Sequence, residues 1–283
     1  MKALPEMIGA FAHEKENPDM NKTNQRCITS VGPTVGVLAG APFSGPVDSP
    51  HEALLALVER SGGRIDKAVL YNPDAVALWL YEKYPEKFRP AGECSDLALP
   101  MTSVMPSVTP VCFGSMYTGV LPAVHGIQKY EKPVLRQETL FDAFLRAGKK
   151  CAIVSTAGDS ISKIFLEREM DYFIYRTVAA VNRKALALVK SGAYDLITIY
   201  NGNYDSRMHA KGPESGYALN ALDRNVAFYH KLVSTIKKSY AGQRVFYGFC
   251  PDHGCHLIDG NRGSHGLDME EDMNVIHFYG ISG

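Results

Sequence analysis

Thr109 has the residue type and the sequence context of a nucleophile for an anionic substrate. It is followed by Pro110 and then by small and apolar residues at helical spacing, which predicts an N-cap at Thr109 and a buried helix behind it. Backbone N–H groups at a helix N-terminus favour an anion such as phosphate beside the Thr109 hydroxyl. A Thr that only caps a helix is the more common alternative, so the rest of the chain has to decide.

Aspartate and histidine side chains follow several of the predicted strands. Carboxylates and imidazoles are the usual ligands of zinc and related divalent metals, and three Asp with three His exceed what one ion needs. Two ions about 3.5–4 Å apart can activate a hydroxyl and stabilise the leaving oxygen of a phosphate ester. The candidate ligands are Asp74, Asp205, His209, Asp252, His253 and His265.

Each candidate ligand also has a simpler interpretation. Asp74 could cap the helix that follows it. Asp205 and His209 could be solvated loop residues. Cys255 and His256 are weaker metal candidates than the others, because adjacent ligands rarely all face one ion. The conjunction of these residues, more than any one of them, indicates a metal site.

Apolar strands alternate with helices along most of the chain, which predicts an α/β fold with a mostly parallel sheet and helices on both faces. In such sheets ligands collect beyond the carboxyl ends of the strands, where the candidate Asp and His residues would meet. Residues 201–213 are expected to form a loop. The predicted strands are 67–71, 151–155, 172–175, 194–200, 244–249 and 274–279, and the predicted helices are 51–60, 75–84, 138–147, 161–169, 179–190 and 214–239.

Composition sets the size and class of the protein. The 283 residues, 46% of them hydrophobic, suffice for one large domain, expected at 51–283, after an irregular N-terminal arm at 1–50 that is rich in Gly, Pro, Ser and Asn. Thirty basic and thirty acidic residues leave no net charge, which argues against a nucleic acid polymer as partner. With no signal peptide and no apolar run of membrane-spanning length, we expect a cytoplasmic protein. The six Cys lack CxxC spacing and are expected to be buried free thiols.

Five motifs together resemble a known family: Asp74 stands for the family's first-strand Asp, and four longer stretches follow it. In the same order, they resemble motifs of the alkaline phosphatase superfamily, most closely those of its nucleotide pyrophosphatase/phosphodiesterase branch, and the resemblance covers residues 66–283. The longer stretches are Pro106-Ser-Val-Thr109-Pro-Val-Cys112 leading to Thr118-Gly-Val-Leu-Pro-Ala-Val-His125-Gly-Ile127, then Asp205-Ser-Arg-Met-His209-Ala-Lys-Gly-Pro213, Asp252-His253-Gly254 and His265-Gly-Leu-Asp268.

The resemblance implies an alkaline-phosphatase-like core with Thr109 as the nucleophile. Thr109 would attack phosphorus and form a phospho-threonine, which water then hydrolyses. The resemblance also implies two divalent ions, with Zn²⁺ preferred and Mn²⁺ as the alternative. One ion would be held by Asp205, His209 and His265, and the second by Asp74, Asp252, His253 and the oxygen of Thr109.

Three departures from the family pattern concern the substrate. Asn72-Pro-Asp-Ala replaces the family's Asp-Gly after the first strand, which predicts a different backbone shape beside one ion. Cys112 stands where the family has an Asn that contacts the phosphoryl group, and the loss of such a donor costs about 2.7–4 kcal/mol in the transition state. The short segment between Thr109 and Asp205 predicts a site that is open or roofed by the N-terminal arm.

The leading hypothesis is a phosphohydrolase that cleaves a phosphodiester or nucleotide pyrophosphate bond in a small phosphate ester. The alternatives are a phosphate monoesterase or phosphonate hydrolase on the same scaffold, and a catalytically degenerate protein that binds metal or a nucleotide. Arg207 and Lys211 are candidate substrate contacts beside Cys112, with a solvated surface charge as the alternative for Arg207 and Lys211. No membrane partner is expected, and a homodimer formed through residues 1–50 is a further hypothesis.

Overall fold

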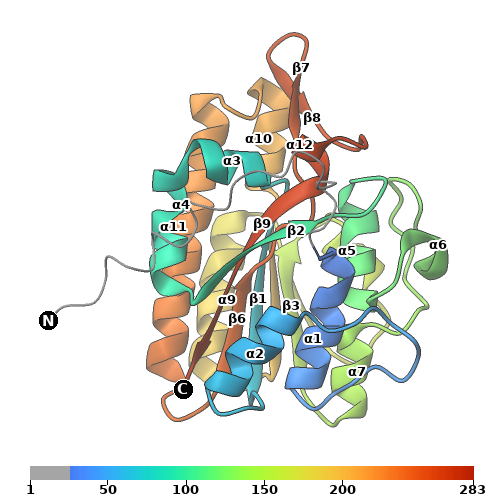
Figure 1. The fold of residues 1–283 in the computed structure, drawn as a ribbon, viewed down its shortest axis with the longest axis vertical. Coiled ribbons are helices and arrows are strands. Elements are labelled where there is room, and N and C mark those ends of the chain that lie inside the picture. Colours follow the sequence, from blue (N-terminus) through green and yellow to red (C-terminus); the bar gives the residue numbers. More distant parts are fainter. Residues whose placement is uncertain (1–25) are drawn as a thin grey trace, which may run out of the picture.

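A seven-stranded sheet forms the centre of the computed structural model, which describes residues 26–283 (Figure 1). The strand order is β2-β9-β6-β1-β5-β3-β4. The pairs from β6 to β4 are parallel, whereas β9 runs antiparallel to both of its neighbours. This confirms the predicted α/β class. The strands are β1 (Lys67–Pro73), β2 (Leu97–Thr102), β3 (Cys151–Thr156), β4 (Asp171–Tyr175), β5 (Leu196–Asn201), β6 (Val245–Phe249) and β9 (Asn274–Ser282).

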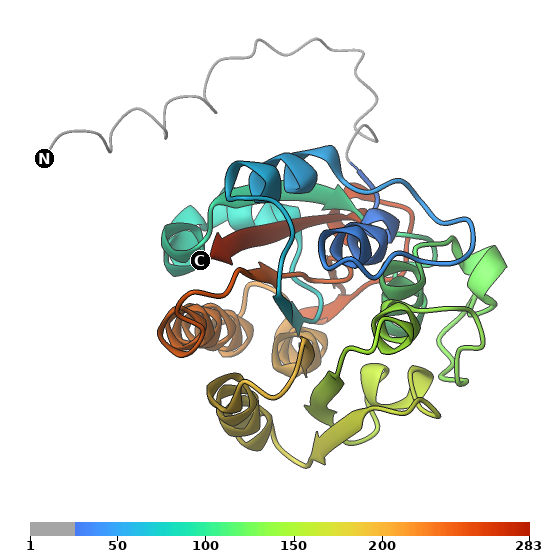
Figure 2. The same ribbon diagram turned by 90° about the horizontal axis from the view of Figure 1, so that it is seen from below.

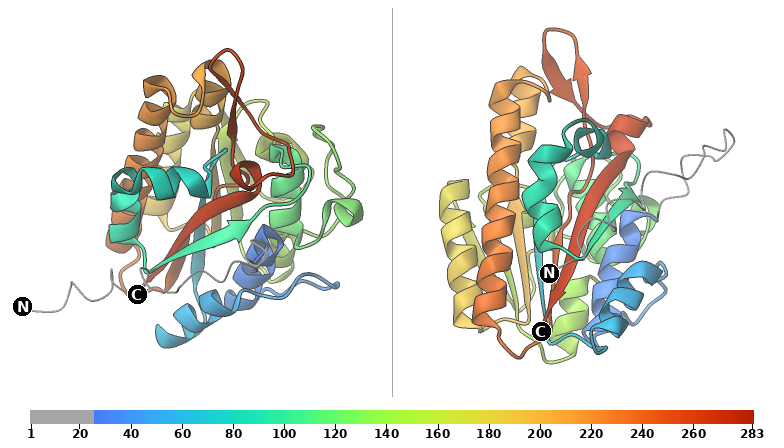
Figure 3. Two further views of the ribbon diagram at one scale, coloured as in Figure 1. Left: turned by 45° about the horizontal axis from the view of Figure 1, so that its top comes forward. Right: turned by 60° about the vertical axis from the view of Figure 1, so that its left-hand side comes forward.

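Helices cover both faces of the sheet, because its central strands are apolar on both sides. In β1, Val69 and Tyr71 belong to one hydrophobic core, whereas Ala68 and Leu70 belong to the other. Figures 2 and 3 show the two helical layers with the sheet between them. The first layer includes α3 (Leu78–Lys83), α4 (Pro85–Cys94), α9 (Val178–Ser191) and α11 (Gly216–Ser239), and the second includes α1 (Val31–Leu38), α2 (Glu52–Arg60), α5 (Thr109–Thr118), α7 (Leu140–Arg146) and α8 (Ile161–Ile164).

The expectation of an irregular arm at 1–50 is wrong for part of that range. Residues Ile28–Ser30 form a 3-10 helix that leads into α1, and nearly all of α1 is buried. Gly36 lies against the backbone of Ala41, where a Cβ would be 2.8 Å from the carbonyl oxygen. At Gly32 a Cβ would likewise be 2.7 Å from Met116 O, so both glycines of α1 allow close packing of the helix. Residues 1–25 lie outside the described part of the chain.

Strand β2 and helix α10 are two of the elements that were absent from the sequence prediction. Strand β2 pairs with β9 at an edge of the sheet, which is where a strand that contains a proline, here Pro100, is tolerated. Residues 201–213, predicted as a loop, contain the helix α10 (Asn203–Lys211). The Gly and Asn residues that suggested a loop instead lie at the start of this helix, and Gly212 ends it.

Short elements complete the end of the molecule at which the parallel strands terminate. They are α6 (Pro122–His125), the hairpin of β7 (His256–Ile258) with β8 (Arg262–Ser264), and α12 (Glu270–Met273). Figure 1 shows the hairpin beside α10. The six cysteines are free thiols, as predicted, and all but the half-buried Cys27 are buried. Among residues 26–283, no helix combines the length and apolar character needed to cross a bilayer.

Candidate metal centre and nucleophile

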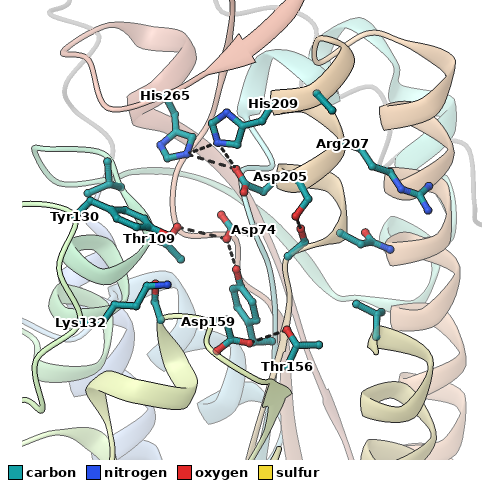
Figure 4. Close-up of a pocket in the computed structure, with 18 of the residues that line it drawn as sticks. Asp74, Thr109, Tyr130, Lys132, Thr156, Asp159, Asp205, Arg207, His209 and His265 are labelled. Atoms are coloured by element: carbon teal, nitrogen blue, oxygen red, sulfur yellow. Dashed lines mark hydrogen bonds and ion pairs between the residues drawn. The ribbon is translucent and has the colours of Figure 1, made fainter. Parts of the chain in front are cut away.

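The candidate residues converge at the carboxyl ends of three adjacent strands. Asp74 directly follows β1, Asp252 follows β6 on one side of it, and Asp205 lies in α10 just after β5 on the other side. Asp74 and Asp205 line a cavity of roughly 730 Å³, shown in Figure 4. The parallel order of these strands brings together side chains that are far apart in the sequence.

The first cluster consists of Asp205, His209 and His265. Asp205 and His209 are four residues apart on α10, and so they share a face of the helix. Asp205 Oδ1 is 3.2 Å from His209 Nε2 and 3.4 Å from His265 Nε2. The two Nε2 atoms are 3.1 Å apart. Figure 4 shows all three side chains pointing toward one another.

The second cluster consists of Asp74, Asp252 and His253, which are almost completely buried. His253 Nε2 is 3.3 Å from Asp74 Oδ1 and 3.5 Å from Asp252 Oδ2. The rings of His253 and His265 stack with their centroids 4.0 Å apart, so the two clusters are adjacent.

The hydrogen bonds of the three histidines orient a nitrogen lone pair toward each cluster. Nδ1 of His209 donates to Gly263 O at 2.9 Å, and Nδ1 of His265 donates to the Ser107 carbonyl at 3.0 Å. His253 Nδ1 is 2.9 Å from its neighbour's carbonyl, Gly254 O. Because a carbonyl only accepts, the proton of each neutral ring belongs on Nδ1, which leaves Nε2 free to bind a metal.

Three carboxylate oxygens indicate what the clusters are suited to hold. Oδ1 of Asp74, Oδ1 of Asp205 and Oδ2 of Asp252 are buried and have no hydrogen-bond partner within the described residues. Leaving a buried charged oxygen unpaired is costly, and a divalent ion between these oxygens and the Nε2 atoms removes that cost. The Nε2 separation in the first cluster is close to the roughly 3.3 Å expected for two nitrogens of a tetrahedral zinc site. The residues present therefore fit one divalent ion in each cluster.

Thr109 is positioned beside the second cluster. Its Oγ1 lies 3.4 Å from Asp74 Oδ2 and 3.4 Å from His253 Nε2. The predicted N-cap role is wrong, because Val108 is the N-cap and Thr109 is the first residue of α5. The carbonyl of Val108 accepts the first backbone hydrogen bonds of the helix. The Thr109 hydroxyl is consequently directed toward the carboxylate instead of capping the helix.

Tyr200 also belongs to the site, although the sequence gave no reason to select it from the aromatic residues of an apolar strand. It lies in β5, beside Asn72 of β1. Its buried hydroxyl donates a hydrogen bond to Asp74 Oδ2. One oxygen of Asp74 therefore faces Tyr200 and Thr109, and the other faces His253.

The electrostatics of the site reflect three carboxylates in a confined space. Burial, together with the nearby charge of Asp205, raises the pKa of Asp74 to about 7. Burial and the charge of Asp74 raise the pKa of Asp252 well above its usual range. Burial also disfavours the charge on Asp205, but the adjacent His209 and His265 rings lower its pKa. Such a site favours cations, since a bound cation stabilises the ionised carboxylates.

Ala75 adopts the left-handed conformation, with φ of 64°. This conformation costs a residue other than glycine about 1–2 kcal/mol. The Ala75 N–H donates to Asp252 Oδ1 at 3.4 Å, which links the ends of β1 and β6. Where the family motif has Asp-Gly, this chain has Asp74-Ala75. Ala75, which has a side chain, therefore adopts a conformation that glycine adopts readily.

The overall fold is shared with solved structures of known enzymes. Phosphonoacetate hydrolase from Sinorhizobium meliloti 1021, in complex with phosphonoformate, matches 67% of this chain and 56% of that chain, with 18% identity and a TM-score of 0.52. An inactive form of murine ectonucleotide pyrophosphatase / phosphodiesterase 5, in complex with AMP, matches 69% of this chain and 59% of that chain, with 14% identity and a TM-score of 0.54. The chain has the alkaline-phosphatase-like fold.

A third structure with this alkaline-phosphatase-like fold is the zinc complex of the C-terminal periplasmic domain of EcEptC from Escherichia coli. It matches 76% of this chain and 72% of that chain, with 14% identity and a TM-score of 0.53. The chain thus spans less than two thirds of the hydrolase and the phosphodiesterase. No protein-family model and no curated protein matches the sequence.

Within the alkaline-phosphatase-like fold, the predicted substrate contacts have different outcomes. Arg207 lines the cavity, whereas the exposed Lys211 is not part of its wall. Cys112 is fully buried and does not line the cavity; its Sγ accepts a hydrogen bond from Ser103 Oγ at 3.1 Å. The predicted substrate contact at Cys112 is therefore wrong, because this position of α5 faces the core. His256 pairs with Asp272 at 2.7 Å and lies outside both clusters.

Proposed function

We propose that the protein is a two-metal phosphohydrolase that cleaves a phosphodiester or nucleotide pyrophosphate bond through a phospho-threonine intermediate. The position of the Thr109 hydroxyl carries this proposal, because it lies 3.4 Å from atoms of two predicted metal ligands, Asp74 and His253. A hydroxyl in that position is a suitable nucleophile for an electrophile bound at the metal centre.

The proteins that share the fold support this chemistry. One is described as a phosphonoacetate hydrolase, one as a nucleotide pyrophosphatase and phosphodiesterase bound to AMP, and one as a zinc complex. The first two descriptions concern phosphorus compounds, and the third concerns a zinc complex of a protein with this fold. We therefore propose zinc as the metal, with manganese as the alternative.

The two clusters and Thr109 have different roles in the proposed reaction. Asp205, His209 and His265 would hold one ion, and Asp74, Asp252 and His253 the other, next to the Thr109 oxygen. When bound, the ions supply positive charge that activates the hydroxyl and stabilises the leaving oxygen. Thr109 Oγ1 forms a bond to phosphorus as the bond to the leaving oxygen breaks, and water later cleaves the phospho-threonine.

Tyr200 and Asp74 orient the nucleophile before it reacts. The Tyr200 hydroxyl fixes Asp74 Oδ2. In turn, Asp74 Oδ2 is within 3.4 Å of Thr109 Oγ1, close enough to accept the proton of that hydroxyl. The buried position of all three groups limits the access of water to the hydroxyl before a substrate is bound.

A phosphonate hydrolase or phosphate monoesterase is the second candidate. Two observations favour it: Lys132 and Arg207 lie in the cavity wall, and a structure with the same fold is a phosphonoacetate hydrolase. Monoesters and phosphonates that carry more negative charge than a diester need such cations. A catalytically degenerate protein is less well supported, because the predicted ligands and Thr109 are all present and grouped.

The test is hydrolysis of bis-p-nitrophenyl phosphate and p-nitrophenyl phosphate by the zinc-loaded protein, with metal content measured in parallel. We expect about two ions per chain and faster diester hydrolysis. Thr109→Ala should keep the metal and lose at least about a thousandfold in kcat, since it removes the nucleophile. Thr109→Ser, the matched control, should keep measurable turnover because it retains a hydroxyl.

The same assay can refute the proposal in two ways. Metal binding without turnover of either ester by the wild type would show that the scaffold binds metal but is not a phosphohydrolase for these bonds. Full activity of a metal-loaded Thr109→Ala protein would exclude the phospho-threonine intermediate.

A further inference from the structure

Tyr130 is an exposed aromatic residue in the wall of the cavity, and 62% of it is accessible to solvent. Glu131 N donates to Lys129 O at 2.7 Å, so Tyr130 lies at the apex of a tight three-residue turn. The side chains of Lys129 and Glu131 form an ion pair at 3.5 Å on either side of the tyrosine. In Figure 4, Tyr130 and Thr109 lie on the same side of the cavity.

The segment that carries this tyrosine is fixed to helix α5, which begins with the proposed nucleophile. Ile127 N donates to His125 Nδ1 at 3.2 Å. The proton of the neutral His125 ring therefore belongs on Nε2, which is 2.9 Å from Ser115 Oγ in α5. Burial keeps the ring neutral, because it lowers the pKa of His125 to about 4. Gly114 of α5 permits this contact, since a Cβ there would be 2.8 Å from His125 Cε1.

The tyrosine ring is also held from the other end of the segment. Lys132 Nζ is 5.1 Å from the centre of the Tyr130 ring and donates to Gly158 O at 2.9 Å. Leu135 N donates to Ile164 O at 2.8 Å, which anchors the chain again after the turn. The Tyr130 hydroxyl itself has no hydrogen-bond partner among residues 26–283. A side chain that is held in this way loses little conformational freedom when its hydroxyl binds a ligand.

The N-terminus of α5 has few N–H donors left for an anion beside Thr109. Pro110 has no N–H. Val111 N and Cys112 N both donate to Val108 O at 3.0 Å. The Cys112 side chain is buried and does not line the cavity. The backbone donors that usually hold an anion at a helix N-terminus are therefore largely used within the helix, and a phosphoryl oxygen needs a donor from another element.

We propose that the Tyr130 hydroxyl donates a hydrogen bond to an oxygen of the phosphorus group while Thr109 attacks it, which makes Tyr130 a catalytic residue. This rests on the proposed phosphohydrolase function and adds a donor to its mechanism. The hydrogen bond accelerates the reaction because the accepting oxygen carries more negative charge in the transition state than in the bound substrate. The hydroxyl keeps its proton throughout, and no covalent bond to Tyr130 forms.

The experiment compares kcat/KM for bis-p-nitrophenyl phosphate in the zinc-loaded wild type and in Tyr130→Phe. This substitution keeps the ring beside Lys132 and removes only the hydroxyl. We expect kcat/KM to fall by about 100- to 1,000-fold, mainly through kcat, as for the loss of one oxyanion donor. The metal content should equal that of the wild type.

Tyr217→Phe is the matched control. Tyr217 is 55% exposed and lines the same cavity, and its ring packs against Arg207 with the guanidinium carbon 4.5 Å from the ring centre. Figure 4 shows Arg207 on the side of the cavity opposite Tyr130. Loss of the Tyr217 hydroxyl should therefore leave kcat/KM close to the wild-type value.

Orthovanadate gives a second readout, because it adopts the five-coordinate geometry of phosphoryl transfer, whereas inorganic phosphate is tetrahedral. Tyr130→Phe should weaken inhibition by vanadate at least about tenfold more than inhibition by phosphate, since a transition-state analogue uses the donor more fully. An equal effect on both inhibitors would contradict a role in the transition state.

Wild-type kcat/KM in Tyr130→Phe would overturn the proposal. Retained activity in Tyr130→Phe with a loss in Tyr130→Ala would also overturn it, because the ring and not the hydroxyl would then contact the substrate. If the wild type cleaves no ester, the hydrolase function fails first, and calorimetric titration with vanadate decides the contact separately. Tighter binding by the wild type than by Tyr130→Phe supports the contact, and equal binding contradicts it.

Discussion

At the scale of single residues, Asp74 connects the groups to which the proposed mechanism gives a catalytic role. Its Oδ2 accepts from Tyr200 and lies near Thr109 Oγ1, while Oδ1 faces His253 Nε2. A carboxylate held in this way presents one oxygen to a metal and the other to the nucleophile. Groups that orient metal ligands typically change metal affinity or activity by 10- to 100-fold when they are removed.

Replacement of Tyr200 by Phe tests this arrangement. Without its hydroxyl, Asp74 gains rotational freedom, and we expect zinc affinity and kcat each to fall by about 10- to 100-fold. A competition titration of the metal-free protein with a chromogenic chelator measures the affinity independently of activity. Tyr204→Phe is the matched control, because the Tyr204 hydroxyl is equally buried but donates to Pro213 O. Equal losses of zinc affinity and kcat in the two variants would show that Tyr200 has only a structural role.

Residue types, spacing and the family resemblance selected six candidate ligands and Thr109, and the structure brings these residues together at one edge of the sheet. Burial and side-chain direction were not available from the sequence. Cys112 was expected to face the substrate, but the turn of α5 directs it into the core. Tyr200 was overlooked because an aromatic residue in an apolar strand normally packs in the core.

At the scale of elements, α10 and the β7–β8 hairpin form the two sides of the first metal cluster. Gly263 of β8 packs so closely on α10 that an added Cβ would lie 2.8 Å from Met208 O. His209 donates to the Gly263 carbonyl, and His265 follows the end of β8. A bound ion would add a further connection between the helix and the hairpin.

Zinc should therefore slow amide hydrogen exchange in the hairpin. If opening of β7–β8 separates His265 from α10, free zinc at 100 times its Kd stabilises the closed state by about 2.7 kcal/mol and slows exchange by about 100-fold. Exchange measured by mass spectrometry with zinc and with a chelator tests this for residues 256–264. Peptides of α9, on which no candidate ligand lies, provide the internal control. Equal protection in both conditions would show that the metal does not link these elements.

The loop after β6 depends on a glycine that has no room for a side chain. Gly254 N donates to Asp272 O at 2.7 Å, and a Cβ at Gly254 would lie 2.0 Å from the Glu271 carbonyl oxygen. Gly254→Ala should therefore displace the adjacent His253. We expect a loss of about 1–3 kcal/mol in the free energy of unfolding and weaker occupancy of the second metal cluster.

Gly92→Ala is the comparison for this substitution. Gly92 lies inside α4, and nothing is within 4 Å of a Cβ at this position. Alanine should be neutral there or stabilise by up to about 1 kcal/mol. Urea unfolding and metal analysis of both variants measure the contrast. Native-like stability and metal content in Gly254→Ala would contradict the steric argument.

The element prediction from sequence was most successful where periodicity was strong. The parallel strands and the long helix α11 were found within a few residues. The helix α10 was missed because Gly202, Asn203 and Gly212 gave turn signals, although Asp205 and His209 at helical spacing would have been consistent with a helix. Strand β2 was missed because its partner β9 is far away in the sequence, and strand pairing cannot be read from local pattern.

At the scale of the whole molecule, a buried histidine couples stability to pH. His277 is fully buried between Tyr279 OH and the Pro251 carbonyl, each 2.7 Å from a ring nitrogen. Burial lowers the pKa of His277 from its ordinary value of 6.5 to about 3. The unfolded chain therefore binds a proton below pH 6.5 that the folded chain does not.

The contribution of His277 to stability should be complete above pH 6.5 and decrease as the pH falls toward 3. The expected slope is up to about 1.4 kcal/mol per pH unit for one group. Urea unfolding between pH 7 and pH 4 measures it. His277→Gln should flatten the dependence by up to this amount even if its stability at pH 7 is lower. An unchanged slope in the variant would refute the assignment to His277.

The position of β1 between β5 and β6 has a consequence for synthesis of the chain. Translation runs from the N-terminus, so Asp74 and Thr109 leave the ribosome well before Asp252, His253 and His265. Strand β1 cannot pair on both sides until β5 and β6 have been synthesised, and such long-range pairings form slowly. A nascent chain that stops before residue 252 lacks ligands in both clusters. By the proposed mechanism, an unfinished product of translation therefore cannot hydrolyse phosphate esters.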